Sequence, residues 1–503
     1  MKFLFKITSP ALLFLLVVHF FSCKKNKLTT DSGDKVEISQ DSVLFDTVFT
    51  NIGSATKNIR IRNKNKQRIK ISSIQLVGGS TSAFKVNVDG SPGTSFSDIE
   101  IAAEDSMYIF LQVNVNPNNL NSPFIIQDSL IFIVNGNVLK VQLEAWGQNA
   151  YYHRPKSAIK FKDGSFLPYS LCDSLPGSFT MVGNEVVWNN DKPHVIYGYC
   201  VVDEFQKLRI QAGTKVYLNS RSSLWVYQGG ELKVLGQKGN EVIFQGVRRE
   251  KEYEDRPGQW DRIWINEGSN NNEIDYAIIK NGFIGVQAEL FGDSLGGKGQ
   301  LKLTNTKIQN MSKWGLYCFA YKVFAGNNVI SNCLEHCVKI QAGGAYLFLQ
   351  CTFANYWSQP DKARELPTFI INNYIEDAIT KQVQVLPLNA YFGNNIIDGK
   401  MDNELSLDVK DHNVYVPKFK FSSCLVKSTG STADTSHYLD VRKVGEALKY
   451  KDVKKYDFEP DGENQIKGFT GPNAMNDQSY FMTDINGKAR NPGYVIVGAY
   501  EAQ

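Results

Sequence analysis

The sequence lacks the short motifs that mark several common catalytic and metal-binding sites. It contains no P-loop, no HExxH pair and no dinucleotide fingerprint between a strand and a helix. Its eight cysteines form no CxxC pair and its six histidines are scattered, so the ligand spacing of a zinc site is missing. We therefore predict no cofactor and no metal, and we assign no catalytic residue.

The chain also lacks an excess of charge of one sign. Its formal net charge is +4 over 503 residues, whereas nucleic-acid-binding domains usually carry a clustered basic excess. We therefore expect no nucleic-acid partner. Apolar residues make up 42% and charged residues 21%, which is typical of folded protein, and the length predicts two or more domains.

The apolar run at the N-terminus is too short to span a membrane. "ALLFLLVVHFF" (Ala11–Phe21) has 11 residues, against about 20 for a spanning helix. It follows Lys2 and Lys6 and ends just before Cys23, a signal-peptide pattern. The pattern resembles a bacterial lipoprotein signal, which implies that 1–22 is removed and that Cys23 carries the lipid. The alternative is an ordinary secreted protein with a stray cysteine.

The remaining seven cysteines are irregularly spaced and do not indicate a disulfide framework. Cys172 and Cys200 could pair in an exported protein, or both could be buried thiols. "CLEHC" (Cys333–Cys337) offers three potential ligands but no second cluster to complete a metal site.

Two kinds of β pattern follow a polar tether at 23–40. Residues 41–150 alternate apolar and polar side chains, as in "KNIRIRN" (Lys57–Asn63), with turn residues between the segments. About seven short strands over such a length predict an immunoglobulin-like antiparallel sandwich. Residues 151–430 consist instead of short strands separated by Gly and Asn, with internal self-similarity.

The repeat is clearest in four segments that align on one apolar position. The aligned residues are Ile308, Ile330, Phe353 and Ile397, spaced by 22, 23 and 44 residues. The last spacing is either two periods or one coil with an insertion. An amide stands three positions before each: Asn305, Asn327, Gln350 and Asn394.

A period near 22 with several strands per turn predicts a right-handed parallel β-helix, in which equivalent residues stack on one another. Stacked amides can satisfy one another's hydrogen bonds along the column. We therefore predict that Asn327 points inward between Asn305 and Gln350, while the role of Asn328 stays open. Residues 431–503 break the period and are predicted to form a cap, with helical spacing at Val441, Val444 and Leu448.

Three stretches carry a resemblance to a known family. They are "FDTVFTNIGSATKNIRIRN" (Phe45–Asn63), "PGQWDRIWINEGS" (Pro257–Ser269) and "VGAYE" (Val497–Glu501). Together with the lipid signal, they resemble outer-membrane lipoproteins of the Bacteroidota that carry a parallel β-helix and a choice-of-anchor-like C-terminus. The resemblance implies fold and an outer-membrane location; it implies no agreed activity, and it leaves open whether the protein faces the periplasm or the cell surface.

The densest polar segment is "RREKEYEDRPGQWDRIW" (Arg248–Trp264), which interrupts the coil pattern. Carboxylates beside aromatic rings suit sugar binding, so we name Tyr253, Trp260, Asp261 and Arg262 as a candidate ligand loop. The alternative is a solvated loop under which Trp260 and Trp264 pack as core.

Three functions fit these observations. The first is a non-catalytic lipid-anchored envelope protein whose β-helix presents a surface for a polysaccharide or an envelope protein. The second is a β-helix lyase or hydrolase acting on acidic glycans, although we find no pair of carboxylates or acid cluster beside a base as a local motif. The third is a subunit of an outer-membrane assembly.

Overall fold

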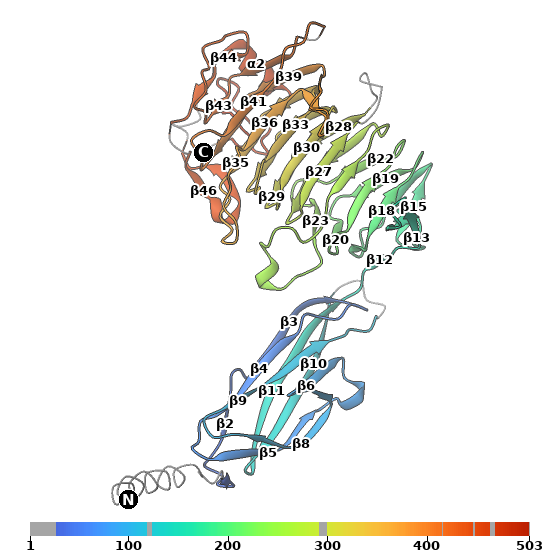
Figure 1. Cartoon of the computed structure of the whole chain (residues 1–503), viewed down its shortest axis with the longest axis vertical. Coiled ribbons are helices and arrows are strands. Elements are labelled where there is room, and N and C mark those ends of the chain that lie inside the picture. Colours follow the sequence, from blue (N-terminus) through green and yellow to red (C-terminus); the bar gives the residue numbers. More distant parts are fainter. Residues whose placement is uncertain are drawn as a thin grey trace, which may run out of the picture. The chain divides into compact units, whose positions relative to one another are not determined.

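The computed structural model describes residues 27–117, 123–290, 299–414, 416–445, 448–462 and 468–501. Cys23 and the signal segment lie outside these ranges. The chain divides into two compact units, Met1–Asn149 and Ala150–Gln503 (Figure 1). Each unit has its own hydrophobic core.

The N-terminal unit is a sandwich of two mainly antiparallel sheets. One sheet contains β1 (Leu28–Thr29), β5 (Arg68–Leu76), β10 (Phe124–Val134), β11 (Asn137–Gln148), β3 (Ser42–Phe49) and β8 (Ser95–Ile101). The other contains β2 (Val36–Ile38), β4 (Lys57–Asn63), β9 (Ser106–Val113), β6 (Phe84–Val88) and β7 (Ser91–Gly93). Strand alternation buries one face of each sheet, as at Ile59 and Ile61. The predicted immunoglobulin-like sandwich is confirmed.

The second unit is a parallel β-helix built from three long sheets (Figure 1). Sheet I contains β12 (Tyr151–His153), β17 (His194–Ile196), β20 (Lys215–Leu218), β23 (Val242–Gly246), β26 (Ala277–Lys280), β29 (Lys307–Gln309), β32 (Val329–Ser331), β35 (Thr352–Asn355), β40 (Ile396–Gly399), β43 (Leu425–Val426) and β45 (Arg442–Lys443). Its strands pair in parallel throughout this order.

Sheets II and III complete each coil. Sheet II contains β13 (Ser157–Lys160), β14 (Phe166–Leu171), β18 (Tyr199–Val202), β21 (Ser223–Val226), β24 (Ile263–Ile265), β27 (Ile284–Glu289), β30 (Trp314–Phe319), β33 (Val338–Gln341), β36 (Phe369–Asn372) and β41 (Leu405–Asp408). Sheet III contains β15 (Phe179–Val182), β16 (Glu185–Trp188), β19 (Lys207–Gln211), β22 (Glu231–Leu235), β25 (Asn272–Asp275), β28 (Gln300–Thr304), β31 (Lys322–Gly326), β34 (Gly344–Leu349), β39 (Leu388–Gly393), β42 (Lys418–Ser422) and β44 (Tyr438–Leu439). Antiparallel hairpins β13–β14 and β15–β16 begin these two sheets.

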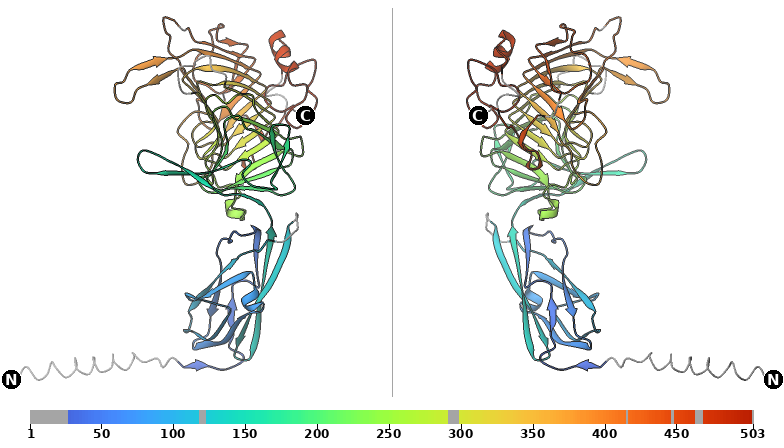
Figure 2. Two further views of the ribbon diagram at one scale, coloured as in Figure 1. Left: turned by 90° about the vertical axis from the view of Figure 1, so that its right-hand side faces the viewer. Right: turned by 90° about the vertical axis from the view of Figure 1, so that its left-hand side faces the viewer.

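The repeat read from the sequence corresponds to one coil. Ile308 pairs with Ile330, Ile330 with Phe353, and Phe353 with Ile397, all in sheet I. The spacing of 44 residues is therefore one coil with an insertion, which includes the hairpin β37 (Tyr374–Glu376) and β38 (Val383–Val385). Figure 2 shows this hairpin projecting from the coils on the side away from α2 (Pro472–Ser479).

The C-terminal segment packs against the outer face of sheet I. Val329, Ile396 and Leu425 of that sheet share a hydrophobic cluster with Phe469 and Val495. The segment also contains β46 (Tyr450–Asp452) and β47 (Asp457–Pro460), and the structure has short 3-10 turns at η1 (Gly79–Thr81), η2 (Lys251–Tyr253) and η3 (Val453–Lys455).

The helical spacing predicted around 441–453 was wrong. Its described residues form β45, which extends sheet I by pairing with β43, and then β46. Unpaired backbone groups at the end of a sheet favour another strand, and this tertiary pairing overrides a local periodicity. In the part of the chain that the structure describes, no helix is long and apolar enough to cross a membrane.

Candidate functional site

Sheet II carries a row of aromatic and polar side chains on its outer face. Trp225 on β21 lies opposite Trp264 on β24. Gln287 on β27 comes next, and Tyr317 on β30 follows it. Strand alternation sends the neighbouring side chains, such as Ile263, into the core. Side chains from four successive coils therefore meet on one line.

A hydrogen-bonded network crosses this row. The Arg262 guanidinium pairs with Asp261 Oδ1 at 2.9 Å and donates to Gln287 Oε1. Gln287 Nε2 donates in turn to Glu289 Oε2 at 2.5 Å. On the other side, Ser223 Oγ donates to Asp261 Oδ2 at 2.9 Å. The network thus holds these planar polar groups in defined orientations.

Glu289 is the most enclosed carboxylate of the network. Its side chain is only 3% exposed, and its Oε1 accepts from Trp264 Nε1 at 2.6 Å and from Asn266 Nδ2 at 3.4 Å. Burial raises the pKa of Glu289, although donors from Gln287 and Trp264 act in the opposite direction.

Two aromatic groups flank the network. The rings of Trp225 and Trp264 stack with centroids 5.0 Å apart. On the following coils, the ring centroids of Trp314 and Tyr317 are 4.5 Å apart, and Lys339 Nζ lies 4.3 Å from the Trp314 centroid. Burial, together with the Glu289 carboxylate, raises the pKa of Tyr317. The face therefore combines the partly exposed rings of Trp264, Trp314 and Tyr317 with fixed hydrogen-bonding groups, whereas Trp225 is buried.

The structure separates the four residues of the predicted ligand loop. Asp261 and Arg262 belong to the network on sheet II. Tyr253 lies elsewhere, with its ring contacted by the guanidinium groups of Arg248 and Arg256. Trp260 is 1% exposed and part of the core, and its Nε1 donates to the backbone oxygen of Lys280 at 2.9 Å. Trp260 is therefore corrected from a ligand residue to a core residue, because its large ring fills the column beneath the loop.

Sequence reasoning missed Gln287, Glu289 and Tyr317. Gln287 follows Trp264 by 23 residues, close to the coil period, so aligning "RIWIN" (Arg262–Asn266) with "GVQAE" (Gly285–Glu289) would have placed them together. Tyr317 follows Gln287 by 30 residues, because this coil has a longer connection between β27 and β28. A fixed period therefore could not find it.

The amide ladder lies at the corner between sheets III and I. All four residues have left-handed backbone, with φ between 49° and 58°: Asn305, Asn327, Gln350 and Asn394. Asn327 Nδ2 donates to Asn305 Oδ1 at 2.8 Å. Asn394 Nδ2 lies 3.2 Å from Gln350 Oε1 when the Gln350 amide is oriented to satisfy both of its ends.

These side chains point toward the C-terminal segment and not into the core. Asn327 Oδ1 accepts from Arg490 at 2.6 Å, and Asn394 Nδ2 donates to the oxygen of Ala474 at 2.9 Å. No hydrogen bond joins Asn327 to Gln350 among the described residues. The prediction that Asn327 stacks inward against Gln350 is thus corrected, since its left-handed backbone turns the side chain outward.

Asn328, whose role the sequence left open, faces the core. Asn328 Nδ2 donates to the oxygen of Leu303 at 2.7 Å, and its Oδ1 accepts from the amide of Thr306 at 2.9 Å. Asn395, two coils further, makes the equivalent bonds to Phe348 and Cys351. The inner amides therefore satisfy backbone groups at the corner of each coil.

Within the described residues, the cysteines and the potential metal ligands form no further site. All seven cysteines from Cys172 to Cys424 are buried and free. Over the described ranges, no cluster of three or more His, Cys, Asp or Glu could hold a metal. A GxSxG spacing occurs at 292–296, outside the described residues. The elements on either side of it are strands β27 and β28, whereas that motif forms a nucleophile elbow between a strand and a helix.

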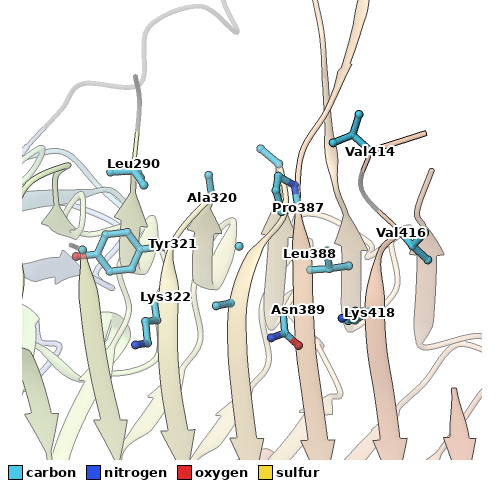
Figure 3. Close-up of a pocket in the computed structure, with 14 residues that line it drawn as sticks. Leu290, Ala320, Tyr321, Lys322, Pro387, Leu388, Asn389, Val414, Val416 and Lys418 are labelled. Atoms are coloured by element: carbon cyan, nitrogen blue, oxygen red, sulfur yellow. The ribbon is translucent and has the colours of Figure 1, made fainter. Parts of the chain in front are cut away.

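A second feature is an open groove of about 850 Å³ where sheet II strands end and sheet III strands begin (Figure 3). Leu290, Ala320 and Ala342 contribute from the ends of sheet II. Lys322, Asn389 and Lys418 contribute from the starts of sheet III strands.

Comparison with known proteins gives partial likenesses only. No family model and no curated protein matches the chain. A protein of unknown function from Porphyromonas gingivalis W83 shares 14% identity over 25% of this chain and 50% of its own, with a TM-score of 0.18. The YadV chaperone shares 14% identity over 23% of this chain and 51% of its own, with a TM-score of 0.16. The E. coli chaperone DraB shares 5% identity over 28% of this chain and 82% of its own, also at 0.16. The chain thus spans about half the length of the first two structures, and these values carry no argument about function.

Proposed function

We propose that this protein is a non-catalytic glycan-binding protein and that the outer face of sheet II is its binding surface. The observation that carries the proposal is the alignment of Trp225, Trp264 and Tyr317 on one face, with the Arg262–Gln287–Glu289 network between them.

The chemistry of this face matches that of a sugar chain. Sugar rings present C–H faces that pack on aromatic rings, and aromatic side chains combine apolar area with a polar edge. Sugar hydroxyl groups hydrogen-bond to planar charged groups such as the partly exposed Arg262 guanidinium, and bonds to charged groups are the stronger ones. A sheet spanning several coils also offers a long surface, which suits a polymer.

Binding is favoured over catalysis because the carboxylates of the network are already occupied. Both oxygens of Asp261 accept hydrogen bonds, from Arg262 and Ser223. Both oxygens of Glu289 do the same, from Trp264 and Gln287. A glycosidase needs two carboxyl groups free to face the scissile bond.

The test is a glycan array probed with the mature chain, followed by titration of the best ligand with variants. We expect Trp264→Ala and Tyr317→Ala to raise Kd about tenfold or more, as truncated anchor residues do. Trp146→Ala is the matched control, because Trp146 is a 46% exposed tryptophan of the N-terminal sandwich. The proposal fails if no glycan binds, or if the control weakens binding as much as Trp264→Ala.

We further propose that Cys23 anchors the protein to the outer membrane by acyl chains, each buried CH₂ contributing about 0.8 kcal/mol. Support comes from the signal pattern alone. Labelled palmitate should be incorporated by the natural chain and not by Cys23→Ala. Incorporation by the variant would refute the anchor, and protease treatment of intact cells would decide which way the protein faces.

A further inference from the structure

The groove between sheets II and III has a floor lowered by small residues. Ala320 and Ala342 occupy left-handed corners of two successive coils, with φ of 49° and 63°. The Tyr321 ring lies in the floor, and its hydroxyl donates to the oxygen of Ser269 at 2.8 Å. A Cβ on Gly344 would collide with the oxygen of Tyr321. Ala320, Ala342 and Gly344 therefore place little side-chain volume in the groove.

Two lysines stand on one line beside this floor. Lys322 lies opposite Ala345, Ala345 opposite Asn389, and Asn389 opposite Lys418. The two lysines are therefore three strands apart, which corresponds to about 14 Å between their backbones. Both are exposed and both line the groove.

These lysines differ from those on the earlier coils of the same sheet. Earlier in sheet III, Lys207 pairs with Glu231 at 3.3 Å, and Lys302 pairs with Glu273 at 2.7 Å. Within the described residues, no acid lies within ion-pair distance of Lys322 or Lys418. These two lysines of the early coils of sheet III therefore have acidic partners, whereas Lys322 and Lys418 beside the groove have none in the described part of the chain.

Part of the rim of the groove is apolar. Val414 and Val416 are each 73% exposed, and Figure 3 shows them beside the groove near Leu388 and Lys418. Exposed valines next to these lysines make a rim that is partly apolar and partly cationic.

We propose that this groove binds a linear acidic polysaccharide, with sugar C–H faces against the apolar side and repeated acidic groups paired with Lys322 and Lys418. Two cations on a line parallel to the stack of coils match a ligand with repeated charge, whereas a single acyl chain has one charged end. An acidic peptide fits less well, because the strands beside the groove are paired on both sides and offer no edge for strand addition. This site goes beyond the proposed function and does not depend on it, since none of its residues belongs to the Trp264 network.

The experiment titrates the mature chain with a galacturonic-acid decamer and with the same decamer after reduction of its carboxyl groups. The double variant Lys322→Glu/Lys418→Glu should weaken binding of the acidic decamer about tenfold or more, because hydrogen bonds to charged groups are lost. The control Lys215→Glu/Lys443→Glu, which changes two exposed lysines of sheet I by the same charge, should retain the natural affinity. Equal losses in both double variants, or equal affinity for the reduced decamer, would overturn the proposal.

Two further variants make the result independent of folding losses. Ala345 lies between the lysines on the outer row, so Ala345→Lys should strengthen binding of the acidic decamer and Ala345→Glu should weaken it. Trp146→Ala should leave this binding unchanged, because Trp146 lies on β11 of the N-terminal sandwich. Poly-glutamate that binds as tightly as the decamer, and is lost in the Lys322→Glu/Lys418→Glu variant, would show a peptide site and refute the glycan assignment.

Discussion

Glu404 is a buried carboxylate with a bidentate partner. Arg364 donates to its two oxygens at 2.5 and 2.7 Å, and the side chains of Glu404 and Arg364 are 0% and 4% exposed, respectively. The amide of Thr368 donates to the same carboxylate at 2.9 Å. At the scale of single residues, such a buried ion pair adds little to the free energy of unfolding compared with apolar side chains of similar size. Removing one partner, however, leaves the other as an uncompensated charge in the core.

We therefore expect Glu404→Gln to lower the free energy of unfolding by about 3–5 kcal/mol. Glu376→Gln is the control, because the Glu376–Lys381 pair is largely exposed and should be worth less than about 1 kcal/mol. Denaturant unfolding of both variants checks this, and similar losses in the two would contradict the assignment.

His153 and His194 form a buried pair stacked on Trp188. His153 Nε2 and His194 Nδ1 are 2.8 Å apart, and the ring centroids of Trp188 and His194 are 4.2 Å apart. Burial lowers the pKa of His194 to about 4 and lowers the pKa of His153 well below its usual value. Both rings are therefore neutral in the folded protein at pH 7.

This pair should make stability depend on pH. The unfolded histidines bind protons below about pH 6.5 and the folded ones do not, so the free energy of unfolding should fall as pH drops from about 6.5 toward 4. Urea unfolding between pH 7.5 and 4.5 should show a shallower fall for His153→Phe/His194→Gln than for the natural chain. His412→Gln, at an exposed histidine, should keep the natural slope. An unchanged slope in the double variant would disprove the role of the pair.

At the scale of elements, the C-terminal segment is held to the β-helix by the outer amides of the corner. Asn327 bonds Arg490, and Asn327 Nδ2 also donates to the oxygen of Thr483 at 3.0 Å. The Arg490 side chain is buried and also donates to the oxygen of Gly498 at 3.1 Å. Arg490 is therefore a hub between the segment and the corner.

Asn327→Ala should loosen this segment without unfolding the β-helix. We expect faster amide hydrogen exchange over 482–501, because the variant removes the partners of Arg490 and Thr483. Asn271→Ala is the control, since Asn271 also has a left-handed backbone (φ 56°) but its side chain is exposed. An alanine in this conformation costs about 1–2 kcal/mol at either position. Unchanged exchange in Asn327→Ala, or equal changes in the control, would refute the anchoring role.

At the scale of the whole molecule, the two units have separate hydrophobic cores. Each core is closed within its own unit, so the units should unfold as separate cooperative blocks. Calorimetry of residues 27–503 should give two transitions, and a fragment of residues 27–149 should reproduce one of them at a similar Tm. A single transition, or an unfolded fragment, would contradict this.

Much of the architecture could be predicted because it follows from local pattern. Alternation in "KNIRIRN" determines which face of β4 is buried, and that requires no knowledge of the partner strand. The recurrence of Ile308, Ile330 and Phe353 predicts stacking, because a coil that leaves two open faces must cover them with copies of itself. For this reason, both the sandwich and the β-helix could be predicted from the sequence.

The sequence by itself determined the two fold types, the coil period and the recurrence of an amide at one position of the coil, but not the direction in which that amide points. Only the tertiary structure decided which outward side chains meet, because insertions of unequal length shift equivalent positions out of any fixed period. Arg262 reaches Gln287 from the preceding coil, and His153 meets His194 across 41 residues. The apolar residues of 441–501 do not indicate, from their sequence alone, that they pack against sheet I. Local periodicity determines which side of a strand is buried. Which side chains come into contact depends on how the coils are stacked.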